Sequence, residues 1–160
     1  MNNLKVLFEN ATDLMKENET VDCLNELLKS YNENDWINYI KYDFEIKDNK
    51  NYYKNLVEIN DIIELYIITW NKHSFSPIHD HPENGCILKI LDGKLCEELY
   101  INKSTNDAKY VELINKSTLN VNDTGYRIGN KILHKIININ DGITVSLHIY
   151  SKPNYKQNIY

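Results

Sequence analysis

The chain has 160 residues, of which 42% are hydrophobic and 26% charged, a composition typical of a globular protein rather than of a disordered chain. Its 18 basic and 23 acidic residues give a net charge of −5 with histidine neutral. Only one of the basic residues, Arg127, is an arginine, and the other 17 are lysines. A negative charge with almost no arginine argues against nucleic-acid binding through a basic face. We attribute the bias toward lysine first to codon usage.

The N-terminal residues carry polar side chains every few positions, so they do not resemble a secretory signal peptide. No segment approaches the ~18–20 apolar residues of a membrane-spanning helix. The three cysteines, Cys23, Cys86 and Cys96, are an odd number and too few for a disulfide framework. These features predict a cytoplasmic protein that does not contact a membrane, and the length predicts a single domain. We expect a monomer.

Residues 1–44 are predicted to form a helical layer. Apolar residues recur there at helical spacing, first at Leu4, Leu7, Phe8, Ala11, Leu14 and Met15. A second helix is predicted after Thr20, a residue type that suits an N-cap, and a short third helix around Trp36. These apolar stripes predict helices that pack against the rest of the protein.

From residue 45 onward the pattern changes to short runs rich in Ile, Val, Leu and Tyr, separated by Asn, Asp, Gly and Lys. The predicted strands are 52–58, 62–70, 85–91, 94–101, 109–114, 132–139 and 143–150. Asp141-Gly142 between the last two runs predicts a hairpin turn. Many short strands without intervening helices predict a mostly β protein, built as an antiparallel sandwich or barrel.

Two of the five histidines form the sequence His79-Asp80-His81. Residues i and i+2 of a strand point to the same face, so both imidazoles can point inward while Asp80 points away. Cys86 follows His81 after four residues, and His134 is followed by Asn138 after three. These spacings resemble the two metal-binding motifs of the cupin superfamily, H-x-H-x(3,4)-E-x(6)-G and H-x(3)-N. Cys86 stands where those motifs usually carry a glutamate ligand.

The cysteine at this position leaves three neutral histidines and no carboxylate among the candidate metal ligands. The common facial triad of non-haem iron enzymes includes one carboxylate. A site of three imidazoles would hold Fe(II) with more positive charge and would therefore favour an anionic thiolate substrate. Zinc or nickel also suits three histidines, so the ligand set alone leaves the metal open.

Two segments and two single residues together resemble the cysteine dioxygenase family of thiol dioxygenases. Ser76–His81 with Cys86 is similar to the family's S-x-I-H-D-H signature and the cysteine after it. Val145–Ser151 is similar to its V-S-L-H-x-Y-S strand, and Trp70 and His134 also match. The resemblance covers about residues 50–152. It implies a jelly-roll-like cupin β-barrel over residues 45–152, with the helical layer before it and a short tail at 153–160, all within one cupin domain.

The resemblance also implies roles for individual residues. His79, His81 and His134 would bind Fe(II), and Cys86 and Tyr150 would be the pair that some family members join by a thioether. Ser146 would hydrogen-bond to His148, which would hold the Tyr150 hydroxyl close to O2. Tyr52 and Lys54 would contact the substrate carboxylate, with Lys54 in place of the family's arginine.

The reaction implied by the resemblance is the oxidation of L-cysteine by O2 to cysteine sulfinic acid, with iron as the only cofactor. Lysine is a point charge rather than a planar fork, so a dioxygenase for another small thiol, such as 3-mercaptopropionate, stays open. A non-catalytic metal-binding cupin is a third alternative. Arg127 lies seven residues before His134, an odd offset that would point to the opposite face of an unbroken strand, so Lys54 is the better carboxylate partner.

Overall fold

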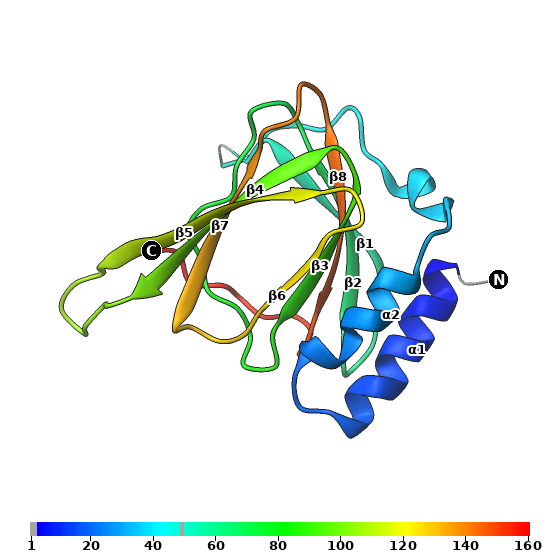
Figure 1. Ribbon diagram of the computed structural model, residues 1–160, viewed down its shortest axis with the longest axis horizontal. Coiled ribbons are helices and arrows are strands. Elements are labelled where there is room, and N and C mark those ends of the chain that lie inside the picture. The colour runs from blue at the N-terminus through cyan, green and yellow to red at the C-terminus, as the bar shows by residue number, and fades with distance from the viewer. Residues whose placement is uncertain (1–2, 49) are drawn as a thin grey trace.

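The computed structural model describes residues 3–48 and 50–160. Eight strands form two antiparallel sheets that face each other and close into a barrel, with the helices on the outside of one sheet (Figure 1). The helices are α1 (Leu4–Glu17) and α2 (Asn25–Ser30), and 3-10 turns cover Val21–Leu24 and Asp35–Tyr39. The strands are β1 (Tyr52–Ile59), β2 (Glu64–Trp70), β3 (Cys86–Asp92), β4 (Lys94–Asn102), β5 (Val111–Asn120), β6 (Thr124–Arg127), β7 (Ile132–Asn138) and β8 (Thr144–Tyr150).

The five-stranded sheet has the order β1-β2-β8-β3-β6 and the three-stranded sheet the order β5-β4-β7. The register within the larger sheet sets Cys86 of β3 directly opposite Tyr150 of β8. On its other side β8 pairs with β2, and Ser146 lies opposite Ile68. The strand that carries most of the predicted catalytic residues is therefore central in its sheet and paired on both sides.

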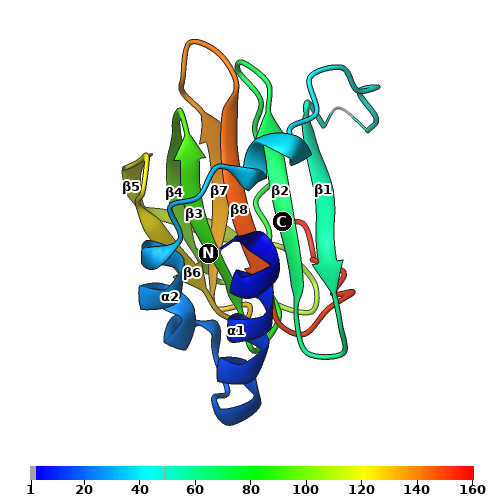
Figure 2. The same ribbon diagram turned by 90° about the vertical axis from the view of Figure 1, so that its right-hand side faces the viewer.

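Period-two alternation along β8 separates two hydrophobic cores. Val145, Leu147 and Ile149 point to the outer face of the sheet and pack beneath the helices, whereas His148 and Tyr150 line the barrel interior. The first core is completed by the apolar faces of β2, β3 and α1, and Figure 2 shows α1 and α2 lying across this sheet. The predicted helical layer and β-barrel are both confirmed.

The apolar stripe of α1 explains how the helix packs. Leu4, Leu7, Ala11 and Met15 recur every three or four residues and are all buried against the sheet. The Asn3 side chain accepts a hydrogen bond from the backbone N–H of Val6 at 3.0 Å and caps the helix. No helix among the described residues has the length and apolar character needed to cross a membrane.

A buried lysine joins the sheet to the helical layer. Lys89 is 1% exposed, and its Nζ donates to the backbone oxygens of Leu28 at 2.9 Å, Lys29 at 3.3 Å and Tyr31. These carbonyls lie at the C-terminal end of α2, where backbone oxygens lack partners within the helix and the helix dipole favours a cation. One ammonium group from β3 therefore satisfies the end of α2.

The structure differs from the sequence-based prediction at four places. Asp141-Gly142 does not close a hairpin, because β7 and β8 belong to different sheets and the chain crosses from one sheet to the other there. The four-residue strand β6 was not predicted, because Thr124–Arg127 contains a glycine and is too short to show alternation. Strand β5 continues to Asn120 beyond the predicted end at 114, because pairing with β4 holds its polar second half. The Thr20 side chain does not cap the following turn; its hydroxyl bonds to the Asp22 carboxylate.

We predict that Lys89→Met lowers the free energy of unfolding by about 3 kcal/mol, because it leaves buried carbonyl oxygens without a donor. Chemical denaturation followed by circular dichroism measures the change. Lys94→Met, at an exposed lysine of β4, the next strand along the chain, serves as the control and should change stability by less than about 0.5 kcal/mol. Equal stability of the two variants would contradict the role given to Lys89.

Candidate metal centre

The segment of residues 74–81 lies along the free edge of β7 and carries two of the three clustered histidines. His79 and His134 exchange two backbone hydrogen bonds, at 3.1 and 3.2 Å. Two further backbone bonds join Ser76 to Ile136 and Asn138 to Ser74, each at 2.8 Å. This ladder fixes the segment against the strand that holds the third histidine. The segment is extended there although it is not part of a regular strand.

The side chains of His79, His81 and His134 converge inside the barrel. All three are buried, and their ligand nitrogens all lie within 4.8 Å of one another. The Nε2 atom of His134 is 3.0 Å from Nε2 of His79 and 3.0 Å from Nε2 of His81. The sequence prediction that these three residues come together is therefore correct, and Asp80 points away from them as expected.

Hydrogen bonds at the other ring nitrogens leave two of the Nε2 atoms free. The Nδ1 of His79 lies 2.8 Å from the carbonyl oxygen of Pro77, and Nδ1 of His134 lies 2.8 Å from Oε2 of Glu97. Both partners can only accept, so each Nδ1 carries the proton and each Nε2 presents its lone pair to the cluster. Within residues 3–48 and 50–160, the buried Nδ1 of His81 finds no hydrogen-bond partner.

Burial keeps these imidazoles neutral. It lowers the pKa of His79 to about 4 and holds the pKa values of His81 and His134 well below their usual range. A neutral imidazole with an exposed lone pair is the form that binds metal ions.

The spacing of these nitrogens suits a metal ion. Two nitrogens that each lie about 2.1 Å from one ion, at right angles, are about 3.0 Å apart, which is the spacing found between His134 and each of the other two histidines. Imidazole donors suit iron, zinc, copper and nickel, so the residues define a metal site but not its metal.

A buried glutamate behind His134 was missed by the sequence analysis. Glu97 is 2% exposed and lies on β4, diagonally across from His134 on the same face of the sheet. Its second oxygen accepts a hydrogen bond from the guanidinium of Arg127. Burial raises the pKa of Glu97, and Arg127 opposes that rise. The sequence contains one indication of this position. Glu97 lies two residues after Leu95 in β4, so both side chains point to the inward face of the strand.

Arg127 and His134 do not share an unbroken strand, so the odd offset between them does not determine where Arg127 points. Arg127 ends β6 in the five-stranded sheet, and His134 lies on β7 in the other sheet, so counting residues along one strand does not apply. Both side chains contact the same carboxylate, that of Glu97. Arg127 does not line the cavity described below, and Lys54 does.

The polar side chains of β8 continue the site toward β3. Ser146 Oγ lies 2.8 Å from Nε2 of His148 and accepts a hydrogen bond from the Trp70 indole at 2.9 Å. Nδ1 of His148 is 3.9 Å from the sulfur of Cys86. The His148 and Tyr150 rings are stacked with centroids 6.1 Å apart, and no hydrogen bond joins these two side chains in the described structure. The predicted contact between Ser146 and His148 is thus present, and His148 faces the thiol rather than the phenol.

Cys86 and Tyr150 oppose each other on neighbouring strands, where side chains on one face lie about 5 Å apart at Cβ. Burial raises the pKa of Cys86 to about 12, and burial and the neighbouring sulfur raise the pKa of Tyr150 well above its usual range. The thiol and the phenol therefore both keep their protons at neutral pH.

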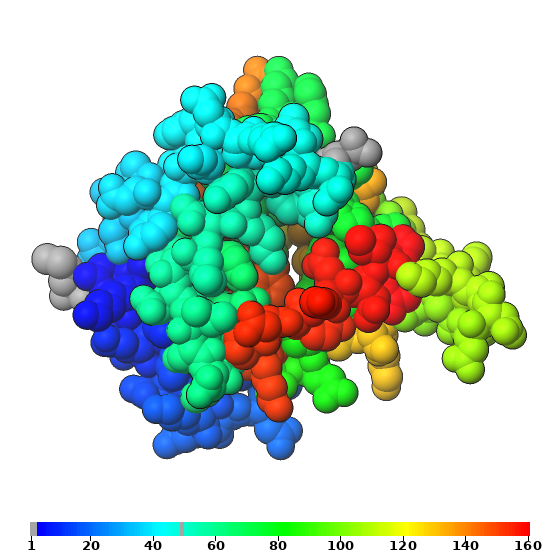
Figure 3. Space-filling model, turned by 180° about the vertical axis from the view of Figure 1, so that it is seen from behind, coloured from blue at the N-terminus to red at the C-terminus, as the bar shows by residue number. Residues whose placement is uncertain are grey.

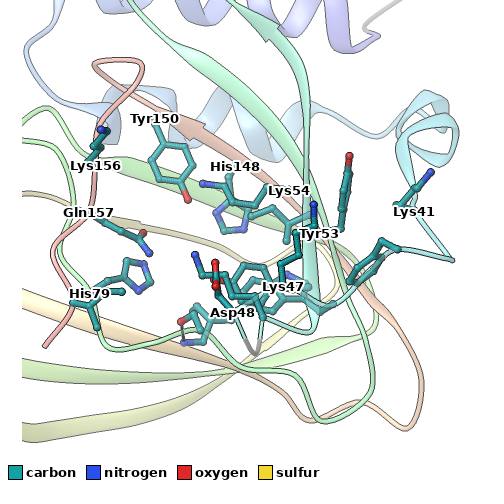
Figure 4. A pocket seen from close by; sticks show the side chains of 18 of the residues that line it. Lys41, Lys47, Asp48, Tyr53, Lys54, His79, His148, Tyr150, Lys156 and Gln157 are labelled. Atoms are coloured by element: carbon teal, nitrogen blue, oxygen red, sulfur yellow. Dashed lines mark hydrogen bonds between the residues drawn. The ribbon is translucent and has the colours of Figure 1, made fainter.

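A cavity of about 780 Å³ opens from the histidine cluster to the surface. Figure 3 shows the hollow between the cyan segment before β1 and the red C-terminal tail, and Figure 4 shows His79, His148 and Tyr150 facing it. Lys54 and Tyr52 both line the cavity, as their shared parity on β1 predicts. The Lys54 ammonium lies 4.5 Å from the ring centroids of both Tyr66 and Tyr150, and burial lowers its pKa. Tyr52 packs against Trp70 with the two ring centroids 4.6 Å apart and the ring planes tilted by 30°.

Asp80 ties the C-terminal tail to the site. Its carboxylate accepts hydrogen bonds from the Asn158 backbone at 2.8 Å, the Asn158 amide at 2.7 Å and the Tyr155 hydroxyl at 3.0 Å. Tyr155, Gln157 and Ile159 in turn form one wall of the cavity. Asp80, which lies between two candidate ligands in the sequence, thus has a structural role. This agrees with the expectation that Asp80 is not a ligand.

The fold and the histidine cluster together define a cupin-type β-barrel with a site suited to a metal ion. Residues 4–160 match the model of the family described as Cysteine dioxygenase type I, and the chain belongs to that family. It is 35% identical over 139 residues to cysteine dioxygenase type 1 of Rattus norvegicus, a match that covers 83% of this chain and 66% of that protein. The chain thus spans slightly less than two thirds of the length of this curated relative.

Solved structures agree on the fold. A Klebsiella pneumoniae protein with a double-stranded β-helix domain superposes with a TM-score of 0.56 at 10% identity, covering 81% of this chain and 97% of that one. A cupin-like protein of Thermotoga maritima gives 0.50 at 14% identity, covering 69% and 77% of the two chains. These identities are low, so the likeness concerns the fold alone.

We predict that the metal-free protein loses stability on acidification from about pH 6.5. Burial depresses the folded-state pKa of His79 to about 4 and of His148 to about 3, whereas the unfolded chain protonates at the ordinary value of 6.5. The unfolded state therefore binds more protons in this interval, and the free energy of unfolding falls as the pH falls. Urea denaturation at pH 7, 6, 5 and 4 measures the slope.

Two variants test whether the buried histidines cause this slope. His148→Asn should reduce it, whereas His73→Gln, at an exposed histidine, should leave it unchanged. A stability that stays constant between pH 7 and 5 would contradict the prediction.

Proposed function

We propose that the protein is an Fe(II)-dependent thiol dioxygenase that oxidises L-cysteine with O2 to cysteine sulfinic acid. The reaction is balanced by adding both oxygen atoms of O2 to the sulfur of the thiol, without another electron donor. The observation that carries the proposal is the convergence of three buried, neutral histidines at one end of an open cavity that also holds Lys54 and Tyr150. Membership of the cysteine dioxygenase family supports it.

Iron is the proposed metal, held by His79, His81 and His134, and it supplies the redox chemistry that joins O2 to a thiolate. Three neutral ligands leave the positive charge of Fe(II) uncompensated among its direct contacts. The substrate thiolate would provide the compensating negative charge, which favours a thiol over a neutral substrate.

Lys54 is the proposed anchor for the substrate carboxylate. Its ammonium group lies between the rings of Tyr66 and Tyr150, so its position is restrained on two sides. Tyr52 on the same face of β1 forms the adjacent wall. Because lysine provides one point charge rather than two parallel donors, we expect a carboxylate to be bound less specifically than by an arginine.

Tyr150 is the proposed hydrogen-bond donor beside the reacting oxygen. Its raised pKa keeps the hydroxyl protonated at neutral pH, and His148 with Ser146 and Trp70 supports the neighbouring side of the site. A metal-binding protein without catalysis would not require this row of polar groups next to the cavity.

Oxygen uptake with a panel of thiols tests the proposal. We predict that the Fe(II)-loaded protein consumes O2 in the presence of L-cysteine and forms the sulfinate, and that His134→Ala abolishes both iron retention and uptake. Uptake with 3-mercaptopropionate but not with cysteine would move the assignment to another small thiol. Iron binding without uptake for any thiol would leave a non-catalytic cupin and contradict the enzyme.

A second prediction concerns a covalent bond between Cys86 and Tyr150. After aerobic turnover, part of the protein should have lost two hydrogens, as the sulfur joins the tyrosine ring and O2 accepts the electrons. Peptide mass mapping detects the joined peptides. Cys86→Ala should abolish this species, whereas Cys96→Ala, at a cysteine of the other sheet, should retain it. Two unmodified peptides after extended turnover would contradict the cross-link.

A further inference from the structure

We propose that Glu97 and Arg127 are a positioning pair that orients His134 and sets the electrostatic potential at the metal. The inference rests on the metal site of the proposed function and goes beyond its ligands and substrate contacts. It concerns a carboxylate that does not itself face the cavity and the only arginine of the chain.

The geometry of Glu97 suits an outer support of a ligand. Its Oε2 lies 2.8 Å from Nδ1 of His134, so it fixes both the tautomer and the plane of that ring. His134 is the histidine whose Nε2 lies 3.0 Å from each of the other two, which makes it the central member of the cluster. Carboxylates in this position hold the ligand nitrogen toward the metal and make it a stronger donor.

Arg127 completes the pair from the opposite sheet. Its guanidinium bonds to the other oxygen of Glu97, while the backbone of Arg127 lies opposite Cys86 at the edge of the five-stranded sheet. The arginine side chain is 24% exposed and the glutamate side chain 3%, so the glutamate is the buried member. A buried carboxylate without this partner would be an uncompensated charge, which is costly in a protein interior.

As a result, the charge around the site is set by two residues, Glu97 and Arg127, that are not direct ligands of the metal. Glu97 supplies the negative charge that the three direct ligands lack, and Arg127 cancels it. The two residues should therefore act on the metal with opposite sign. Removing Glu97 leaves an unopposed positive charge and disfavours Fe(III), whereas removing Arg127 leaves an unopposed negative charge and favours Fe(III).

Two measurements on the purified full chain test the pair. In the first, Co(II) is titrated into metal-free protein and followed by visible absorption; Glu97→Gln should weaken binding 10- to 100-fold. In the second, the Fe(III)/Fe(II) midpoint potential of iron-loaded protein is measured anaerobically. It should rise in Glu97→Gln, fall in Arg127→Met, stay close to the parent value in Arg127→Lys and return toward it in the double variant Glu97→Gln/Arg127→Met.

A neighbouring ion pair supplies the control. Glu98 and Lys116 form an ion pair of 3.3 Å on the adjacent strands β4 and β5, and Glu98 follows Glu97 on the opposite face. Glu98→Gln and Lys116→Met should leave both metal affinity and potential unchanged. A purely structural role in closing the barrel would lower stability in both single variants without shifts of opposite sign.

The outcomes separate this proposal from the proposed function. Shifts of the potential in the same direction for both single variants, or Co(II) affinity unaffected by Glu97→Gln, would overturn the positioning pair while the metal site stands. Failure of the parent protein to bind Fe(II) or Co(II) would overturn the metal site and the pair together. Opposite shifts with normal metal binding but no oxygen uptake would support the pair and contradict only the enzyme.

Discussion

The pairing of residues 74–81 with the edge of β7 is the interaction on which the site depends. Two backbone hydrogen bonds between His79 and His134 set these residues side by side, although 55 positions separate them in the chain. The same segment carries His81 into the barrel and turns Asp80 outward to hold the C-terminal tail. This backbone pairing thus places His79 and His81 beside His134. Asp80 of the same segment holds the tail that forms one wall of the cavity.

The alternation of side chains along the strands separates the hydrophobic core from the site. Along β8, each apolar residue packs under the helices and each polar residue faces the interior, so the core and the site share one strand. The helices stabilise that strand from outside, with Lys89 joining β3 to the end of α2. The helical layer therefore helps to keep His148 and Tyr150 in place, although no residue of α1 or α2 lines the cavity.

Much of this arrangement could be predicted from the sequence because the signals are local. Helical spacing located α1, and alternation located β2, β3, β4, β7 and β8. Strand alternation also put His79 and His81 on one face, whereas His134 joined them through the resemblance to the cupin metal-binding motifs. The parity of Tyr52 and Lys54 put both on one face of β1, and the family resemblance assigned that face to the cavity that both residues line. The elements and the shared faces depend on periods of two and 3.6 residues, which a single sequence displays directly.

The features that were missed depend on contacts between the two sheets. Glu97 is one of two adjacent glutamates in β4, and only the register with β7 shows which of them meets His134. Arg127 was considered for the substrate carboxylate and oriented by counting along one strand, but it belongs to the unpredicted strand β6. Barrel closure, not local pattern, brings these two side chains together. In this lysine-rich chain the single arginine, Arg127, therefore lies behind the metal site, and Lys54 lines the cavity.

The account as a whole depends on the three histidines holding iron in a form that accepts a thiolate. X-ray absorption at the iron edge tests this most directly, on iron-loaded protein before and after anaerobic addition of L-cysteine. The account predicts nitrogen or oxygen neighbours alone before the addition and a new sulfur neighbour afterwards. An unchanged spectrum, with no sulfur neighbour at saturating cysteine, would contradict it.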